Sequence, residues 1–121
     1  MTLQPNLIVS SLSNLASVRI DRTISSVVAD YYLIHEKHVF SNSRKKEHVR
    51  ARRMVMLLLW ETGLSWMSIG VILRRHHSTV MDQVKKLKAF IDIYPDVEID
   101  YLLIKSRLNR GISNELHLEE I

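Results

Sequence analysis

The chain has 121 residues and a formal net charge of +4; 46% of its residues are hydrophobic and 25% are charged. This length and balance predict one domain with a modest core. There is no cysteine, which excludes disulfides, thiolate metal ligands and thiol catalysis. Only three glycines and two prolines interrupt the chain, so an all-α architecture of long helices is expected.

The first elements are expected to be an arm and a helix. Residues 1–19 mix serine, asparagine and scattered aliphatic residues, which is typical of an arm that packs on a neighbour. Apolar residues at helical spacing predict a helix from about Asp21 to Ile34. A shorter helical turn is expected at 36–40, and the polar stretch "SNSRKK" at 41–46 marks a boundary.

The next predicted helix, from about Arg44 to Thr62, changes character halfway along. Its first half is basic and is expected to protrude into solvent. Its second half, "MVMLLLW", is apolar on every side, which predicts burial on all faces. Gly63 is expected to end the helix as a C-terminal cap.

Two helices then follow with a tight basic turn between them. Ser65 is a suitable N-cap for a short helix over 66–73. A second helix is predicted over 77–91, because Val80, Val84, Leu87 and Ile91 form an apolar stripe. This arrangement indicates a helix-turn-helix. A last helix is expected from about Asp96 to Leu108, followed by a frayed tail.

Positive charge is concentrated in the middle of the chain. Between Arg44 and Lys88 there are eleven basic and three acidic residues, while the rest of the chain has six basic and ten acidic residues. A negatively charged partner is the simplest reason for this distribution. The longest strongly apolar run, Met54–Trp60, is far shorter than the roughly 20 residues of a membrane span, and no secretory signal is visible. A cytoplasmic location away from membranes is therefore expected.

The segment "RRHHST", residues 74–79, contains residue types that several kinds of site use. A metal site would need further ligands, and the two neighbouring arginines would repel a cation. A catalytic histidine would need an orienting carboxylate, and the nearest acid in sequence is Asp82. No glycine-rich phosphate motif is present. Neither an enzyme nor a bound cofactor is therefore expected.

A solvated turn is the simplest alternative, with Ser78 or Thr79 capping the next helix. Capping does not explain why cationic side chains gather at a helix N-terminus, which already carries about +0.5 charge. An anion would offset this charge, and phosphate is the natural one. Together with the basic half of the preceding helix, the turn favours binding to the DNA backbone.

The stretch "VRARRMVMLLLWETGLSWMSIGVILRRHHSTVMDQVKKL" resembles the C-terminal DNA-binding domain of the bacterial replication initiator DnaA. The resemblance runs from about Ile20 to Leu108. It implies a Trp-repressor-like helical domain over residues 20–108, with an N-terminal arm at 1–19 and a C-terminal tail at 109–121. It also implies that double-stranded DNA is the partner.

The resemblance assigns roles to residues of this sequence. Arg50 matches an arginine that enters the minor groove, and His77, Ser78 and Thr79 match residues that contact base edges in the major groove. Further residues are expected to contact bases or grooves beside them: Arg75 and His76. Residues expected at phosphates are Lys45, Lys46, Arg52, Ser65, Trp66, Met67 and Arg74.

Two departures from the family's pattern fall beside the base-reading residues. His76 stands where the family has an aspartate, and the family's Gly-Gly-Arg turn is replaced by the shorter Arg74–Arg75. A carboxylate only accepts hydrogen bonds from bases, whereas imidazole can also donate. The base preference of the family is therefore not assumed for this chain.

The functional hypothesis is a sequence-selective double-stranded DNA binder that regulates replication or transcription. No nucleotide-binding module precedes the domain in this sequence, so a stand-alone protein is expected. The alternative is a protein-interaction module, with Trp66 and the acidic C-terminal part facing a partner. A protein partner or a homodimer is left open, since the aliphatic residues of 1–19 offer a seam for either.

Overall fold

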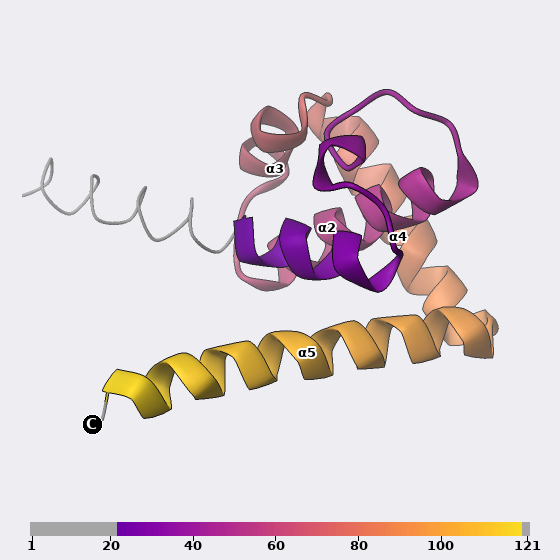
Figure 1. Ribbon diagram of the computed structural model, residues 1–121. Coiled ribbons are helices and arrows are strands. Elements are labelled where there is room, and N and C mark those ends of the chain that lie inside the picture. Colours follow the sequence, from indigo (N-terminus) through magenta and orange to yellow (C-terminus); the bar gives the residue numbers. More distant parts are fainter. Residues whose placement is uncertain (1–21, 120–121) are drawn as a thin grey trace, which may run out of the picture.

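The computed structural model describes residues 22–119, with the side chains of 22–110 (Figure 1). A helix covers residues 22–31 and is followed by a short 3-10 turn. The elements that follow in the chain are η1 (Glu36–His38), α2 (Lys46–Glu61), α3 (Trp66–Leu73), α4 (His77–Ile93) and α5 (Pro95–Glu119). No strand occurs within residues 22–119, which confirms the all-α prediction. The predicted arm, residues 1–19, lies outside the described residues.

The second half of α2 is the centre of the core. The six side chains from Met54 to Leu59 are each at most 3% exposed, which confirms the predicted burial on all faces for these residues, whereas Trp60 at the end of the predicted stretch is half-buried. Helices α3 and α4 both pack against α2 and against each other. The predicted stripe of α4 faces this core, with Val80, Val84 and Leu87 buried and Ile91 half-buried.

Both predicted caps around the α2–α3 connection are confirmed. Gly63 has a φ of 100°, a backbone conformation that favours glycine, and its N–H donates to the Trp60 carbonyl. The Ser65 hydroxyl accepts from the Ser68 N–H at 3.1 Å. These two local signals set the place where α2 ends and α3 begins.

Several helix ends differ from the prediction. The helix 22–31 ends before Ile34, because Leu33 adopts a left-handed φ of 57° and the Ile34 N–H donates to the Ala29 carbonyl. The prediction of a frayed tail after Leu108 was wrong for the backbone, which stays helical to Glu119. This segment has no proline, and its one glycine, Gly111, weakens a helix by about 1 kcal/mol without ending it.

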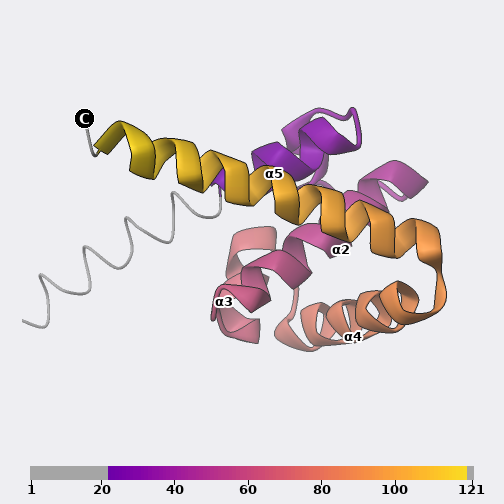
Figure 2. The ribbon, with the colours of Figure 1, turned by 90° about the horizontal axis from the view of Figure 1, so that it is seen from below.

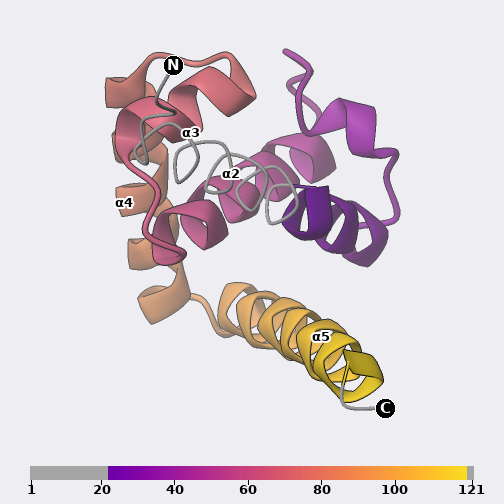
Figure 3. The ribbon, with the colours of Figure 1, turned by 90° about the vertical axis from the view of Figure 1, so that its left-hand side faces the viewer.

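Helix α5 lies on the side of α2 away from α3 (Figures 1 and 3). Seen from the α5 side, it crosses over α2 and over the helix 22–31 (Figure 2). Ile104 is fully buried, and the Tyr31 hydroxyl donates to the Asp100 carboxylate at 2.5 Å. The α5 helix is thereby fixed to the helix 22–31.

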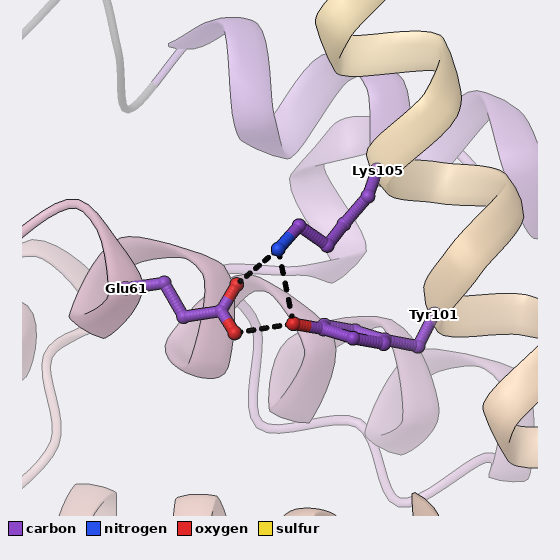
Figure 4. A network of polar contacts seen from close by, with 3 residues as sticks. All are labelled: Glu61, Tyr101 and Lys105. Atoms are coloured by element: carbon purple, nitrogen blue, oxygen red, sulfur yellow. Dashed lines mark hydrogen bonds and ion pairs between the residues drawn. The ribbon is translucent and has the colours of Figure 1, made fainter.

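A polar network joins α5 to the C-terminal end of α2 (Figure 4). The Tyr101 hydroxyl donates to the Glu61 carboxylate, and Lys105 Nζ lies 3.5 Å from the other carboxylate oxygen. Burial, followed by the hydrogen bond to Glu61, raises the pKa of Tyr101. The hydroxyl therefore stays protonated and keeps donating. None of the helices in the described range is long and apolar enough to cross a membrane.

Candidate nucleic-acid interface

The turn between α3 and α4 is held by a close approach of two backbone segments. The Arg75 N–H donates to the Gly70 carbonyl at 2.8 Å. A Cβ added to Gly70 would lie 2.5 Å from the Arg75 carbonyl oxygen, so only glycine fits there. Arg74 completes the turn in a left-handed conformation, with φ 55° and ψ 47°. The expected helix-turn-helix is present. Its turn requires glycine at position 70, which was not predicted from the sequence.

His76 is the N-cap of α4. Its Nδ1 accepts from the Ser78 N–H at 3.2 Å and lies 2.7 Å from the Ser78 hydroxyl. The expectation that Ser78 or Thr79 caps this helix was therefore wrong. An accepting Nδ1 belongs to a neutral imidazole whose proton is on Nε2. His76 thus uses one ring nitrogen for the fold and leaves an N–H donor on an exposed side chain.

The first residues of α4 present polar side chains to solvent. His77 and Thr79 are exposed and Ser78 is half-buried. The rings of His76 and His77 lie 4.2 Å apart at an angle of 32°. Within the described part of the chain, the Thr79 hydroxyl has no hydrogen-bond partner. The structure therefore brings the expected base-contacting residues of the turn together on one helix end.

Arg75 has a structural role at this turn. Its guanidinium donates to the Ser41 carbonyl at 2.6 Å and to the Leu73 carbonyl at 3.0 Å. These bonds tie the turn to the loop that precedes α2. Arg75 is half-buried, so its expected base contact competes with this anchoring.

The prediction that Arg52 contacts a phosphate was wrong, because Arg52 lies in the interior. It is only 8% exposed. Its Nε donates to the Val39 carbonyl at 3.1 Å, and its Nη2 donates to the carbonyls of His38 and Ser43, both at 3.2 Å. Burial, and secondarily the charge of Arg75, lowers the pKa of Arg52. Its position one turn before buried Met56 was the sequence signal for an inward direction.

The loop before α2 carries the exposed cations beside the turn. Arg75 holds it at Ser41, Arg52 holds it at Ser43, and the Ser43 hydroxyl lies 2.7 Å from His48 Nδ1. The cationic side chains that follow these anchors are all exposed: Arg44, Lys45 and Lys46. The structure thus fixes the backbone of a basic loop while leaving its charges free. Of these three, Arg44 was not among the predicted site residues.

Arg50 lies in a different place from the α3–α4 turn. It lines a hollow of about 460 Å³, together with Tyr32 and with Phe90 and Tyr94 near the end of α4. Phe90 follows His77 by thirteen residues, which is about 20 Å along α4, so the hollow that holds Arg50 lies toward the far end of α4 from His77. Other basic residues line the same hollow: Arg44, Lys46 and Arg53. The structure therefore separates Arg50 from His77 and Thr79, and the hollow around Arg50 is lined by these cations together with the carboxylates of Asp96 and Asp100.

The N-terminal end of α3 is partly engaged in packing. The Trp66 ring stacks on Trp60 with centroids 5.3 Å apart, and Lys88 Nζ lies 4.3 Å from the centroid of the Trp60 ring. Trp66 is half-buried, whereas Met67 is 67% exposed. The indole of Trp66 is therefore used mainly for packing, while Met67 and the capping Ser65 remain accessible. Across the described residues, no group of three or more metal-ligating side chains occurs.

A tight glycine-dependent turn that joins a short helix to a longer one, with cations and hydroxyls at the start of the second, defines a helix-turn-helix DNA-binding domain. The family described as the bacterial DnaA protein helix-turn-helix matches residues 22–87, and the chain belongs to this family. The resemblance stated from the sequence is thereby confirmed, together with the helix-turn-helix class.

Curated relatives support this assignment. Over 95 residues, or 77% of this chain, it is 36% identical to the chromosomal replication initiator protein DnaA of Francisella tularensis subsp. tularensis, and equally so to that of Francisella philomiragia. It is 30% identical over 81 residues to the chromosomal replication initiator protein DnaA 1 of Chlamydia muridarum, covering 64% of this chain. The matched segment spans only 19% and 18% of the lengths of these relatives.

Proposed function

We propose that this chain binds double-stranded DNA in a sequence-selective manner, with the start of α4 in the major groove. The observation that carries the proposal is the conformation and charge of Arg74. This residue adopts a left-handed conformation that costs a non-glycine residue roughly 1–2 kcal/mol. Its exposed guanidinium makes no hydrogen bond or ion pair within residues 22–110. A strained, unpaired cation beside the positive end of α4 favours an anionic partner.

Base reading is assigned to the exposed side chains at the start of α4. His77 and Thr79 are exposed, and His76 offers its Nε2–H. A hydroxyl and imidazole nitrogens can bond to base edges, and the threonine methyl can contact thymine. Ser78 is already bonded to His76 and is the weaker candidate. This division of roles among neighbouring residues supports selectivity for particular base pairs.

Backbone contacts are assigned to the exposed cations around the turn. Lys45 and Lys46 extend from the loop and the first residue of α2, and Arg74 extends from the turn itself. The first N–H groups of α3, beside Ser65 and Met67, offer a further site for a phosphate. Contacts of this kind set position on the duplex without reading sequence.

Arg50 is proposed to enter the minor groove next to the major groove that α4 occupies. Phe90, which lines the same hollow as Arg50, lies about 20 Å from His77 along α4, and half a helical turn of B-DNA is about 17 Å. A minor groove lies at that distance from the centre of the neighbouring major groove. The exposed Arg44 and Lys46 beside Arg50 would hold the phosphates that flank it.

The relatives are named as chromosomal replication initiator proteins, and control of replication is the role we propose for this binding. Selection of bound duplexes from a random pool at physiological salt tests the proposal. A recurring sequence with two informative segments, one for α4 and one for Arg50, is expected. Recovery of unrelated sequences after repeated rounds would contradict selectivity.

A further inference from the structure

Helix α5 has two apolar faces, and only one of them is covered. The first face packs on the core and consists of Val97, Tyr101, Ile104 and Leu108. Ile99, Leu102 and Leu103 are 55%, 53% and 48% exposed. At 100° per residue, their mean direction is opposite to that of the first face. A helix that is apolar on two sides is typical of one that packs between two surfaces.

The exposed face has charges of opposite sign at its two ends. Asp96 and Glu98 lie in the first turn of α5. Arg107 and Arg110 lie three to four turns further along, and both are exposed. On the helical projection, Asp96, Arg107 and Arg110 fall on the same flank of the exposed apolar face. One flank of this face therefore runs from acidic to basic along the helix.

We infer that α5 pairs with α5 of a second copy of this chain, antiparallel, about a two-fold axis near Leu102 and Leu103. In such a pair the same flanks face each other, so the acidic start of one helix lies against the basic end of the other. A parallel pair would place like charges together. The surface is therefore complementary to itself, which argues for a second copy over an unrelated partner.

The position of α5 bears on how such a dimer would meet DNA. The α3–α4 turn lies on the opposite side of the molecule from α5 (Figures 1 and 3). Pairing through α5 leaves both turns uncovered and directs them away from each other, while Asp96 and Val97 at the start of each α5 border the hollow of Arg50. On the proposed DNA-binding function, on which this step rests, the dimer bridges two separate duplex segments and does not read adjacent half-sites.

Sedimentation equilibrium of the full chain, without DNA, tests the pairing. A reversible monomer–dimer equilibrium is expected in the micromolar range. Leu102→Asp should raise the dimer dissociation constant at least about tenfold, because it places a charge in the paired apolar face of both copies. The matched control is Val71→Asp, which adds the same charge at a side chain that is 79% exposed on α3, away from α5 (Figures 1 and 3). It should leave the equilibrium unchanged.

A charge exchange provides a second measurement that does not depend on the apolar face. Asp96→Lys and Arg110→Asp should each weaken the dimer, and the double variant should restore it. Arg107 is left unchanged because its guanidinium lies over the Tyr31 ring. A monomer at all concentrations, equal association of the Leu102→Asp variant, or a double variant weaker than both single variants would each overturn the pairing.

The two proposals can fail separately. A chain that dimerises through α5 but binds no duplex keeps the pairing and loses the DNA function. A monomer that binds a selected duplex keeps the DNA function and loses the pairing. Bridging is then measured as capture of a labelled duplex by an immobilised one, and Leu102→Asp should abolish capture while single-duplex affinity is retained.

Discussion

In α2 and in the α3–α4 turn, an arginine that holds the fold lies close in sequence to an arginine that is free. In α2, Arg52 bonds to three carbonyls of the segment 38–43 while Arg50 is exposed. In the turn, Arg75 bonds to the Ser41 carbonyl while Arg74 is exposed. The two inward arginines converge on the same loop. Positive charge in a sequence therefore does not distinguish an interface cation from a structural one; burial and partners do.

The largest expected effect separates the two arginines of α2. Arg52→Met should lower the free energy of unfolding by roughly 2–4 kcal/mol, because charged hydrogen bonds to three carbonyls are lost. Arg50→Met should change it by less than about 0.5 kcal/mol, as expected for an exposed position. Urea denaturation measures both. Equal losses for the two variants would contradict the structural assignment of Arg52.

The second expected effect concerns the turn itself. Gly70→Ala should destabilise the protein by about 1–3 kcal/mol, because its Cβ would meet the Arg75 carbonyl oxygen at 2.5 Å and the backbone must move. DNA affinity should fall as well, since the start of α4 shifts against α3. Gly63→Ala is a useful comparison, because a Cβ there meets nothing within 4 Å and only the backbone conformation is strained.

Arg50 and Thr79 should contribute to selectivity at separate parts of the bound sequence. Arg50→Ala and Thr79→Ala should each reduce discrimination against altered base pairs by roughly 1–3 kcal/mol. The affected base pairs should lie about half a helical turn apart. Competition titrations with single-base-pair variants of the selected duplex measure this. Loss of discrimination at the same base pair in both variants would argue against two-groove binding.

Arg74 combines a conformational cost with a charge, and one substitution separates them. Arg74→Gly should stabilise the fold by about 0.5–1 kcal/mol by relieving the left-handed conformation. The same variant should bind all duplexes more weakly. Leu33→Gly is the matched control, because Leu33 has nearly the same φ, 57°, and carries no charge. It should gain stability without any change in DNA affinity.

The smallest effect is expected at the basic loop. Lys45→Ala should weaken binding to selected and unrelated duplexes equally and reduce the salt dependence of log K by about one unit. A change in base preference would mean that Lys45 reads sequence. Lys37→Ala, an exposed lysine in η1, serves as the control and should leave the salt dependence unchanged if it lies outside the contact.

Local signals in the sequence predicted most of the fold. Helical spacing placed α3 and α4 within two residues, and Gly63 and Ser65 correctly marked the end of α2 and the start of α3, because caps depend on neighbouring residues. Long-range contacts could not be predicted in this way. The inward direction of Arg52 depends on carbonyls 9–14 residues away. The requirement for Gly70 depends on how the turn folds back on α3.

The His76 cap shows the same limit on a smaller scale. Serine and threonine are common capping residues, so the sequence predicts Ser78 or Thr79 as the N-cap of α4. The structure uses an imidazole nitrogen one residue before the helix, which leaves Thr79 unengaged within the described residues. That difference matters for function, because a hydroxyl used for capping would be less available to a base.

Equilibrium competition between a selected duplex and a scrambled duplex of the same length, at physiological salt, tests the central claim most directly. We expect the chain to prefer the selected duplex by a factor of at least about 10³, the lower end of the range for specific DNA-binding proteins. Equal affinity for the two duplexes would show that the exposed residues at the start of α4 do not read base pairs, and would contradict this claim.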